Sequence, residues 1–304
     1  MANRIGEFVE YHSAMQNAGD IDPGYPMLQY VCDRFELNIE QRYWLAFLYA
    51  TCYCAPTVFL IYNRFPDFEL VDIAAMEEWW KIEGRDQSVF QSDRGWIRSR
   101  NQFVDMVKSY RSSLDGLTQE QKFLSLKTSD PLQTYSNCYQ EFSALYQMGR
   151  FALFLYLEAV FVVTGYRMEP NGIELKEAES SRNGICYAMG WDDLITGKET
   201  GLNSIPQSAY PRLNKAFWKI INQLRTERPD ERADVWNVET SLCAYKKFKK
   251  GQRFVGYYLD RQAGEITKLE NLAPHGVDWD VLWDFRAETF DHKHLKEFGG
   301  SVID

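Results

Sequence analysis

One apolar segment constrains the fold of this chain more than any other. From Tyr146 to Gly165 the sequence reads YQMGRFALFLYLEAVFVVTG, and its central part, 151–164, contains a single charged residue, Glu158. A helix that spans a bilayer needs roughly 20 consecutive apolar residues. The segment is shorter than that and carries a carboxylate, so it predicts a buried helix in the core of a globular protein.

Glu158 is the first candidate for chemistry, because burying an unpaired carboxylate costs several kcal/mol. The side chain must therefore be neutral, ion-paired or hydrogen-bonded. A structural ion pair with Arg150 or Arg167 meets this requirement, and so does a catalytic acid or base with a raised pKa. The sequence leaves both interpretations open.

Length and composition restrict the class of protein. The 304 residues are 45% hydrophobic, which is enough for one large core or two smaller ones. No repeat, low-complexity tract or linker divides the chain, so we predict one domain over residues 1–304. The formal charge of −9 excludes a protein that coats nucleic acid indiscriminately, because such proteins neutralise many phosphates at once.

The cysteines favour a reducing compartment. Six are scattered along the chain, and only Cys52 and Cys54 are close together, with no histidine spacing that completes a zinc site. We therefore predict reduced thiols and no metal ligands among them. The N-terminal segment MANRIGEFVEYHSAM has no continuous hydrophobic region and is not a secretory signal.

Hydrophobic periodicity predicts a mainly α fold. The expected helices are Glu40–Ile61, Asp72–Lys81, Ser92–Tyr110, Thr118–Leu126, Glu141–Thr164 with an interruption at Gly149, Pro211–Arg225, and Asp234–Lys250 with Asp234 as its N-cap. The segment 253–270 is compatible with a small β-hairpin near the C-terminus or with a helix. The sequence does not separate these two alternatives.

A basic, aromatic region follows residue 210. Residues 211–253 contain eleven Lys and Arg against five Asp and Glu, a local charge of +6. A solvated helical face is the commoner meaning of such a pattern. Interleaved rings favour nucleic-acid binding, because aromatic faces stack on bases while cations hold phosphates. The rings are Tyr245, Phe248, Phe254, Tyr257 and Tyr258.

Three further patterns are weaker. A second cationic cluster contains Arg94, Arg98, Arg100, Lys108 and Arg111. The segment 180–184, SSRNG, could form a turn whose backbone N–H groups make a nest for an anion. Near the C-terminus, Asp284, Glu288 and His292 share a helical face, which indicates a salt-bridged terminal helix more than a metal site.

The segment 145–152 resembles the helix-hairpin-helix of DNA glycosylases, in which a glycine hairpin offers backbone N–H groups to a phosphate. Gly149 matches the second glycine and Ala152 the small residue that follows, whereas Gln147 stands at the first glycine. The chain has no convincing match for the glycosylase catalytic aspartate. Base excision is therefore the weaker interpretation.

A second resemblance covers residues 25–300 and is carried by long segments. They are WLAFLYATCY with NRFPD, FQSDRGWIRSRNQF, MGRFALFLYLEAV, SSRNGICYAMGWDD, YKKFKKGQRFVGYYLDRQAGEI and WDVLWDFRAETF. In these segments the chain resembles the phage amino acid:DNA transferases, also called alpha-glutamyl/putrescinyl thymine pyrophosphorylases. The resemblance implies a helical architecture related to the glycosylases.

The resemblance also implies a reaction. A 5-hydroxymethyluracil in double-stranded phage DNA, already phosphorylated or pyrophosphorylated, loses that group as the amine of an amino acid or polyamine attacks the 5-methylene carbon. Such chemistry implies an enzyme in the cytoplasm of the infected bacterial host, without a membrane partner. No sequence motif indicates a cofactor, although a divalent metal such as Mg²⁺ could assist departure of the phosphate.

Candidate residues follow from what this reaction needs. Stacking on a flipped base could use Trp96, Tyr187, Trp191, Tyr257 and Tyr258. Stabilising the departing phosphate could use Arg150, Arg182, Asn183, Lys246, Lys247 and Arg261. Deprotonating the amine could use Glu158, Asp192, Asp193 or Asp260, and Arg286 could hold the carboxylate of an amino acid donor. The alternatives are a helix-hairpin-helix DNA glycosylase and a non-catalytic DNA-binding module.

Overall fold

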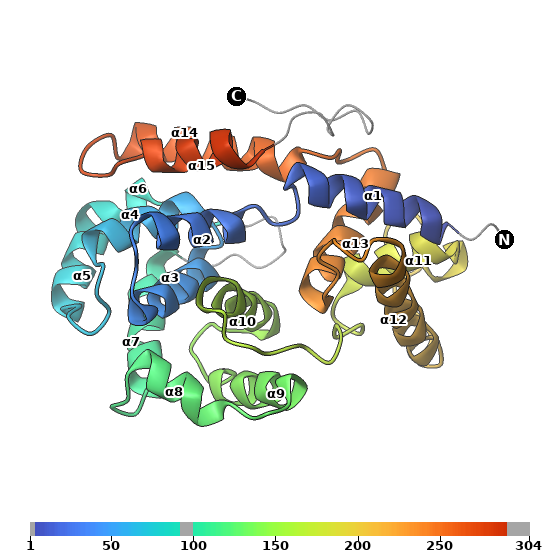
Figure 1. The fold of residues 1–304 in the computed structure, drawn as a ribbon, viewed down its shortest axis with the longest axis horizontal. Coiled ribbons are helices and arrows are strands. Elements are labelled where there is room, and N and C mark those ends of the chain that lie inside the picture. Colours follow the sequence, from blue (N-terminus) through green and yellow to red (C-terminus); the bar gives the residue numbers. More distant parts are fainter. Residues whose placement is uncertain (1–3, 92–99, 291–304) are drawn as a thin grey trace. The chain divides into compact units, whose positions relative to one another are not determined.

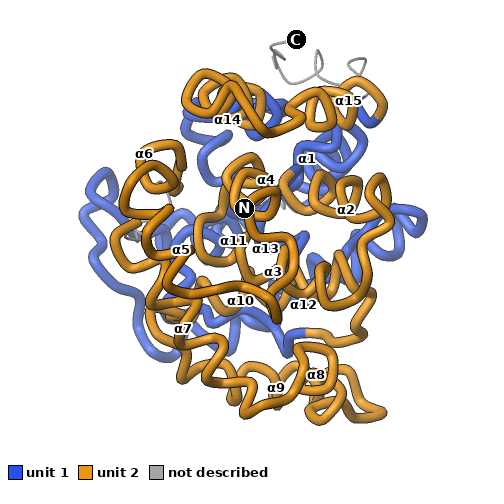
Figure 2. The backbone as a smooth tube through the Cα atoms, turned by 90° about the vertical axis from the view of Figure 1, so that its left-hand side faces the viewer, with its two compact units in different colours: residues 1–23, 170–261, 289–304 blue, residues 24–169, 262–288 orange. Residues whose placement is uncertain are grey.

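The computed structural model describes residues 4–91 and 100–290. These residues form mainly α-helices, as the sequence predicts (Figure 1). Within these two ranges the only β-type pairing is an isolated antiparallel bridge between Gly197 and Leu202. The chain forms two compact units, drawn in separate colours in Figure 2. Unit 1 contains residues 1–23, 170–261 and 289–304, and unit 2 contains residues 24–169 and 262–288.

Unit 2 is built around the apolar segment identified in the sequence. That segment forms α10 (Arg150–Thr164), which packs against α3 (Ile39–Cys52) and α2 (Gly24–Arg34). The other elements of unit 2 are α4 (Ala55–Arg64), α5 (Ile73–Trp79), the π-helical turn η1 (Trp80–Gly84), α6 (Arg85–Gln87), η2 (Arg100–Gln102), α7 (Phe103–Ser113), α8 (Gln119–Leu126), α9 (Pro131–Phe142), most of α14 (Tyr257–Leu272) and α15 (Asp280–Thr289).

Aromatic rings fill the core of unit 2. Phe47 of α3 stacks on Tyr110 of α7, with ring centroids 4.0 Å apart. Tyr156 of α10 meets both rings edge-on, and its hydroxyl donates to the Tyr110 hydroxyl at 2.8 Å. Offset and edge-to-face contacts of this kind stabilise a core beyond the effect of burial alone. The buried hydroxyls satisfy one another, so the tyrosines fit an apolar interior.

The prediction of one helix over Glu40–Ile61 is wrong. Helix α3 ends at Cys52, Tyr53 adopts a left-handed conformation with φ of 50°, and α4 starts at Ala55. Pro56 explains the break, because proline lacks the N–H that a continuous helix would need and its ring clashes with the carbonyl group four residues earlier, that of Cys52. It is tolerated here since it lies in the first turn of α4.

The predicted helix Glu141–Thr164 begins too early, because residues 143–149 are not helical and α10 starts at Arg150. Two other helices begin at capping residues. Thr118 closes a capping box on α8, and Asp72 caps α5. The predicted helix 92–110 is seen from Arg100 onward, whereas 92–99 lie outside the described residues.

Unit 1 is organised by the contact between α11 and α13. Its elements are α1 (Ile5–Ala18), α11 (Glu179–Met189), η3 (Asp192–Leu194), α12 (Ala209–Glu227), α13 (Val235–Lys249) and the first turn of α14. Gly184 of α11 lies so close to α13 that a Cβ atom there would be 2.2 Å from the carbonyl oxygen of Leu242. The absence of a side chain at residue 184 therefore lets the two helices approach closely.

Helix α1 meets α13 through buried polar groups. His12 lies 2.8 Å from the Ser241 hydroxyl, and the Thr240 hydroxyl donates to Asp22 at 2.5 Å. Burial lowers the pKa of His12 to about 4, so the imidazole is neutral at pH 7. Asp234 caps α13 as predicted, by accepting from the Asn237 N–H at 2.9 Å.

The open alternative at residues 253–270 is decided in favour of a helix, and the β-hairpin is wrong. Helix α14 begins at Tyr257 and runs through Gly264 without interruption. None of the described helices has the length and hydropathy needed to cross a bilayer.

Candidate functional site

The start of α14 is fixed by a carboxylate that local sequence patterns do not single out. Asp20 is fully buried and accepts hydrogen bonds from the backbone N–H groups of Gly256, Tyr258 and Leu259 at 2.8, 2.8 and 3.1 Å. Burial raises the pKa of Asp20 to about 7, against the opposing effects of the three donors and of Arg253. Asp20 thus has a pKa raised toward neutrality. A base for the amine needs this property, and the sequence analysis names Glu158, Asp192, Asp193 or Asp260 for that role.

Arg253 joins Asp20 to the tyrosines of the predicted basic region. Its guanidinium carbon lies 4.5 Å from the centroid of the Tyr257 ring and 4.6 Å from that of Tyr258. The same guanidinium donates a hydrogen bond to the Tyr258 hydroxyl. Tyr258 is buried, whereas the Tyr257 ring is partly exposed. Of these two candidate stacking rings, Tyr257 is thus the more accessible.

A second cluster lies on the facing surfaces of α11 and α13. The Cys243 thiol donates to the Ser180 hydroxyl oxygen at 3.1 Å, and the Lys246 ammonium donates to the same oxygen at 3.4 Å. All three side chains are partly exposed. Cys243 also acts electrostatically on the buried Tyr11 hydroxyl, as Asp20, Tyr258 and Arg253 do. The two clusters are therefore neighbours within unit 1.

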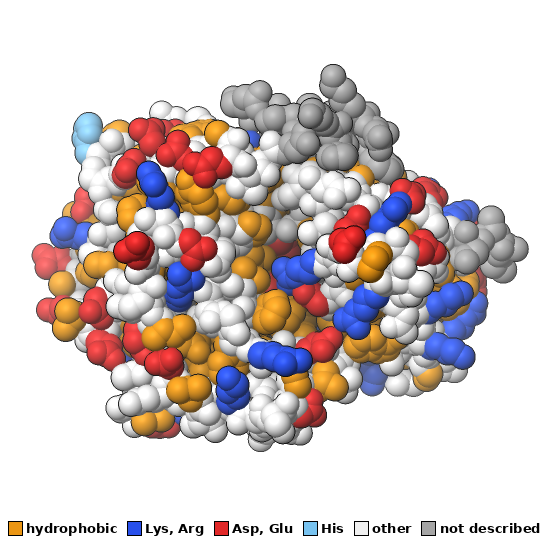
Figure 3. All heavy atoms as spheres, viewed as in Figure 1, with side chains coloured by type: hydrophobic (Ala, Val, Ile, Leu, Met, Phe, Trp, Pro, Cys, Tyr) orange, Lys and Arg blue, Asp and Glu red, His pale blue; other side chains and the backbone are white. Residues whose placement is uncertain are grey.

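The lysines at the end of α13 differ in their partners. Lys249 pairs with Glu7 at 2.6 Å and Lys250 with Glu199 at 2.7 Å. The described part of the chain gives Lys246 only the Ser180 hydroxyl as a hydrogen-bond partner. Lys247 is half-buried. Lys246 thus keeps a positive charge that no carboxylate of the described residues neutralises. Figure 3 shows the Lys and Arg side chains on one face of the molecule in blue.

The backbone nest predicted at residues 180–184 is wrong, because these residues lie inside α11. Arg182 is 5% exposed and donates to the carbonyl oxygens of Leu175 and Lys176. Asn183 is fully buried and exchanges hydrogen bonds with the backbone of Thr196 at 2.8 and 3.0 Å. Arg182 therefore binds the segment before α11, and Asn183 binds the segment after it. The part of both side chains in binding phosphate stays a prediction.

Trp191 and the two aspartates after it lie at the surface of unit 1. Arg212 of α12 stacks on the Trp191 ring, with its guanidinium carbon 3.7 Å from a ring centroid. Asp192 and Asp193 are exposed, and Asp192 forms a long ion pair of 3.5 Å with Arg4. The partly exposed Trp191 ring remains a candidate for stacking, with one face covered by Arg212.

The remaining candidates divide between the units. Asp260 and Arg261 are partly exposed in α14 and belong to unit 1. Glu158, Arg150 and Arg286 belong to unit 2. Glu158 is 2% exposed, which confirms its predicted burial, and Arg286 donates to Gln262 at 3.3 Å. A role for these three side chains beside the unit 1 residues stays a prediction.

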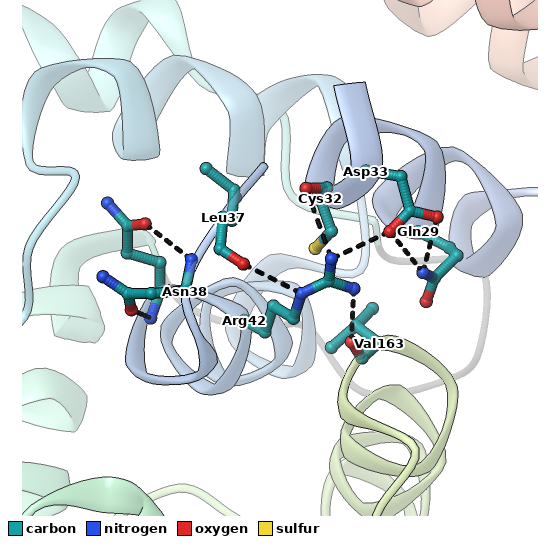
Figure 4. A network of polar contacts seen from close by, with 8 residues as sticks. Gln29, Cys32, Asp33, Leu37, Asn38, Arg42 and Val163 are labelled. Carbon is teal, nitrogen blue, oxygen red and sulfur yellow. Dashed lines mark hydrogen bonds and ion pairs between the residues drawn. The ribbon is translucent and has the colours of Figure 1, made fainter. Parts of the chain in front are cut away.

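Unit 2 has a shallow hollow of about 490 Å³ at the C-terminal end of α10, lined by Gln29, Ile39, Arg42 and residues 162–165. Figure 4 shows the polar contacts of one of these residues, Arg42. Its guanidinium donates to the carbonyl oxygens of Leu37, Val163 and Cys32, and to Asp33 at 2.8 Å. Most of its N–H groups are therefore engaged within the protein, so Arg42 joins three segments of unit 2.

The turn before α10 explains how Gln147 replaces a glycine. Gln147 has a φ of 59°, and Gly149 lies immediately before the first residue of α10. The left-handed conformation usually favours glycine, so the substituted turn keeps a glycine-like backbone at this residue. Its use as a phosphate-binding helix-hairpin-helix stays a prediction.

The described residues contain no group of three or more His, Cys, Asp or Glu placed to hold a metal ion. Trp96, Arg94, Arg98, His292 and His294 lie outside the described residues.

Tyr11, Asp20 and Cys243 were not singled out for chemistry from the sequence, and Ser180 was named only as part of the predicted backbone nest. Asp20 is separated from Gly256 by 236 positions, and Ser180 from Cys243 by 63. A single weak signal existed for one of them, since Cys243 opens the basic segment CAYKKFKK.

These observations define a helical protein in which one unit gathers a thiol, an ammonium and stacked aromatic and guanidinium groups. Comparison with known sequences makes the class specific. The sequence model of the amino acid:DNA transferase family matches residues 16–253, well over half of the chain. The chain therefore belongs to the amino acid:DNA transferase family, as the resemblance implies.

A curated relative is the serinyltransferase of Salmonella phage ViI. It is 26% identical over 269 residues, which cover 82% of this chain and 64% of the relative. This chain thus spans less than two thirds of the length of that relative.

Proposed function

We propose that this protein is a DNA hypermodification enzyme that transfers an amino acid or polyamine, through its amine, to an activated 5-hydroxymethyluracil in double-stranded phage DNA. The observation that carries the proposal is the family match over residues 16–253. The phosphate or pyrophosphate on the 5-methylene is the leaving group. We place the reaction in the cytoplasm of an infected bacterial cell, because the curated relative is a phage protein.

The geometry of unit 1 supports this chemistry. A departing phosphate needs a cation aimed at its growing charge, and Lys246 offers an ammonium whose described partner is a neutral hydroxyl. A flipped base needs an aromatic face, and the partly exposed rings of Tyr257 and Trp191 are candidates. We propose Lys246 for the leaving group and Tyr257 for the base.

The donor is proposed from the relative. Because that protein is named a serinyltransferase, we propose serine as the first amine to test, with glycine, glutamate, lysine and putrescine beside it. An amino acid carboxylate calls for an arginine, and Arg286 and Arg261 are the candidates.

The test is incubation of the protein with DNA that carries phosphorylated or pyrophosphorylated hydroxymethyluracil and with the amine panel. Digestion to nucleosides and mass spectrometry should then detect the mass of the added amine. Ordinary thymine DNA is the matched control and should remain unmodified. Absence of product with every amine on both activated DNAs contradicts the proposal.

Two other functions give different outcomes in the same reaction. A helix-hairpin-helix glycosylase produces abasic sites, which alkaline treatment converts into strand breaks. A non-catalytic DNA-binding module shifts the DNA in a gel without changing the mass of any nucleoside. Neither outcome is compatible with amine transfer as the activity of this chain.

A further inference from the structure

Cys243 differs from the other cysteines in its surroundings. Cys32, Cys52, Cys54, Cys138 and Cys186 are buried, whereas Cys243 is partly exposed. Burial raises the pKa of the thiols of Cys32, Cys138 and Cys186 to about 12, which suppresses their thiolate form. A reactive cysteine is typically accessible and near a positive charge. Among the six, Cys243 is the one that meets the accessibility requirement.

Ser180 connects the Cys243 thiol to a charge. The serine oxygen accepts from the Cys243 thiol at 3.1 Å and from the Lys246 ammonium at 3.4 Å. A hydroxyl has two acceptor lone pairs and one proton to donate. Both lone pairs are used by Cys243 and Lys246, so the hydroxyl proton is left to donate to an oxygen of a bound anion. The cluster thus combines a nucleophile, a cation and a hydroxyl donor on two tightly packed helices.

The chemistry of an activated 5-hydroxymethyluracil offers such a nucleophile a role. Carbon 6 of the ring is an electrophilic position conjugated with the carbonyl at carbon 4. Addition of sulfur there places an electron pair next to the methylene that carries the phosphate. That pair can expel the phosphate without direct displacement by the amine. Covalent catalysis of this kind divides one difficult step into two easier ones.

We propose that Cys243 is the catalytic nucleophile, adding to carbon 6 of the flipped base, with Lys246 and Ser180 holding the departing phosphate. This inference rests on the proposed function. In the first step the S–C6 bond forms, the C5=C6 pair becomes an exocyclic C5=CH₂ bond, and the C–O bond breaks with its pair leaving on phosphate. The thiol proton leaves to the phosphate or to water.

In the second step the amine nitrogen bonds to the exocyclic methylene. The C5=CH₂ pair returns to form C5=C6, and the S–C6 bond breaks with its pair returning to sulfur. The proton lost by the amine restores the Cys243 thiol. Nothing is oxidised or reduced, and the net reaction exchanges phosphate for amine.

The deciding experiment omits the amine. Wild-type protein mixed with activated DNA should release phosphate in a burst of up to one equivalent per protein, with a protein–DNA adduct that survives denaturing electrophoresis. Cys243→Ala should give neither the burst nor the adduct and should lose at least 100-fold in amine transfer. Cys138→Ala, which alters a buried thiol of unit 2, should retain the burst, the adduct and the transfer.

Two measurements separate chemistry from folding. Limiting iodoacetamide should alkylate Cys243 before the buried thiols, as read by peptide mass spectrometry. Cys243→Ala should retain its circular dichroism spectrum and its affinity for the DNA. Lys246→Met should reduce the burst rate, and Lys246→Arg should restore part of it.

The outcomes distinguish this inference from the proposed function. Suppose that wild-type protein transfers an amine. If Cys243→Ala then transfers it within tenfold of the wild-type rate, or if wild-type protein shows no burst, Cys243 is not the nucleophile and the transferase function stands. If wild-type protein releases no phosphate and transfers no amine, both fall together. Preferential alkylation of a buried cysteine also refutes the special accessibility of Cys243.

Discussion

Gly184 offers a sharp test of the packing that positions the Ser180–Cys243–Lys246 cluster. In Gly184→Ala, the new Cβ atom would lie 2.2 Å from the Leu242 carbonyl oxygen and 2.7 Å from the carbonyl carbon. Both obstacles are backbone atoms of α13, so no side chain can rotate away and the helices must separate. Overpacking of this kind typically costs about 1–3 kcal/mol, occasionally more. Because the obstacles are backbone atoms at such short distances, we expect the upper end of this range, about 3 kcal/mol. Alanine returns about 1 kcal/mol of helix propensity, which leaves a net loss of about 2 kcal/mol.

Gly264→Ala is the matched control, because it makes the same change inside α14 at a residue with no atom within 4 Å of the added Cβ. It should stabilise the protein by about 0.5–1 kcal/mol. Urea unfolding followed by circular dichroism measures both changes. Separation of α11 from α13 should also lengthen the Ser180–Lys246 contact and reduce amine transfer in Gly184→Ala alone. A neutral or stabilising Gly184→Ala, beside a stabilising control, refutes the close approach of the helices.

Further predictions concern buried polar groups. The pKa of His12 is lowered from 6.5 to about 4, so its contribution to stability is complete above pH 6.5 and is lost as the pH falls toward 4. His12→Gln should therefore remove about 2–3 kcal/mol of the difference in unfolding free energy between pH 7 and pH 4.5; an unchanged difference contradicts a neutral His12. The pKa of Asp20 is raised from 3.8 to about 7, so its contribution is complete below pH 3.8 and is lost as the pH rises through 7. Relative to wild type, Asp20→Asn should gain about 2–3 kcal/mol between pH 5 and pH 8 in urea titrations, and a parallel pH dependence of the two proteins argues against this titration. Arg42→Met should cost about 3 kcal/mol by leaving the carbonyl oxygens of Leu37 and Val163 without this donor and by removing the ion pair with Asp33, and a thermal midpoint equal to that of wild type excludes this role.

The sequence alone determined the features of this protein that depend on neighbouring residues. The apolar period and single carboxylate of 151–164 predicted the buried helix α10, and the cap Asp234 predicted where α13 begins. Long ordered segments carried the resemblance to the amino acid:DNA transferases, which the family match confirms. These signals act over a few residues or accumulate along the chain, so they can be recognised without coordinates.

Tertiary structure decided what depends on residues that are far apart in the chain. Gly184 suggested a turn, yet residues 180–184 lie in α11, where the missing side chain of Gly184 permits the close contact with α13. The carboxylate at the start of α14 comes from Asp20, 236 positions earlier than Gly256. Local propensity cannot specify such partners, because only packing of the whole unit excludes water from Asp20 and raises its pKa, and only the facing of α11 and α13 brings Ser180 to Cys243.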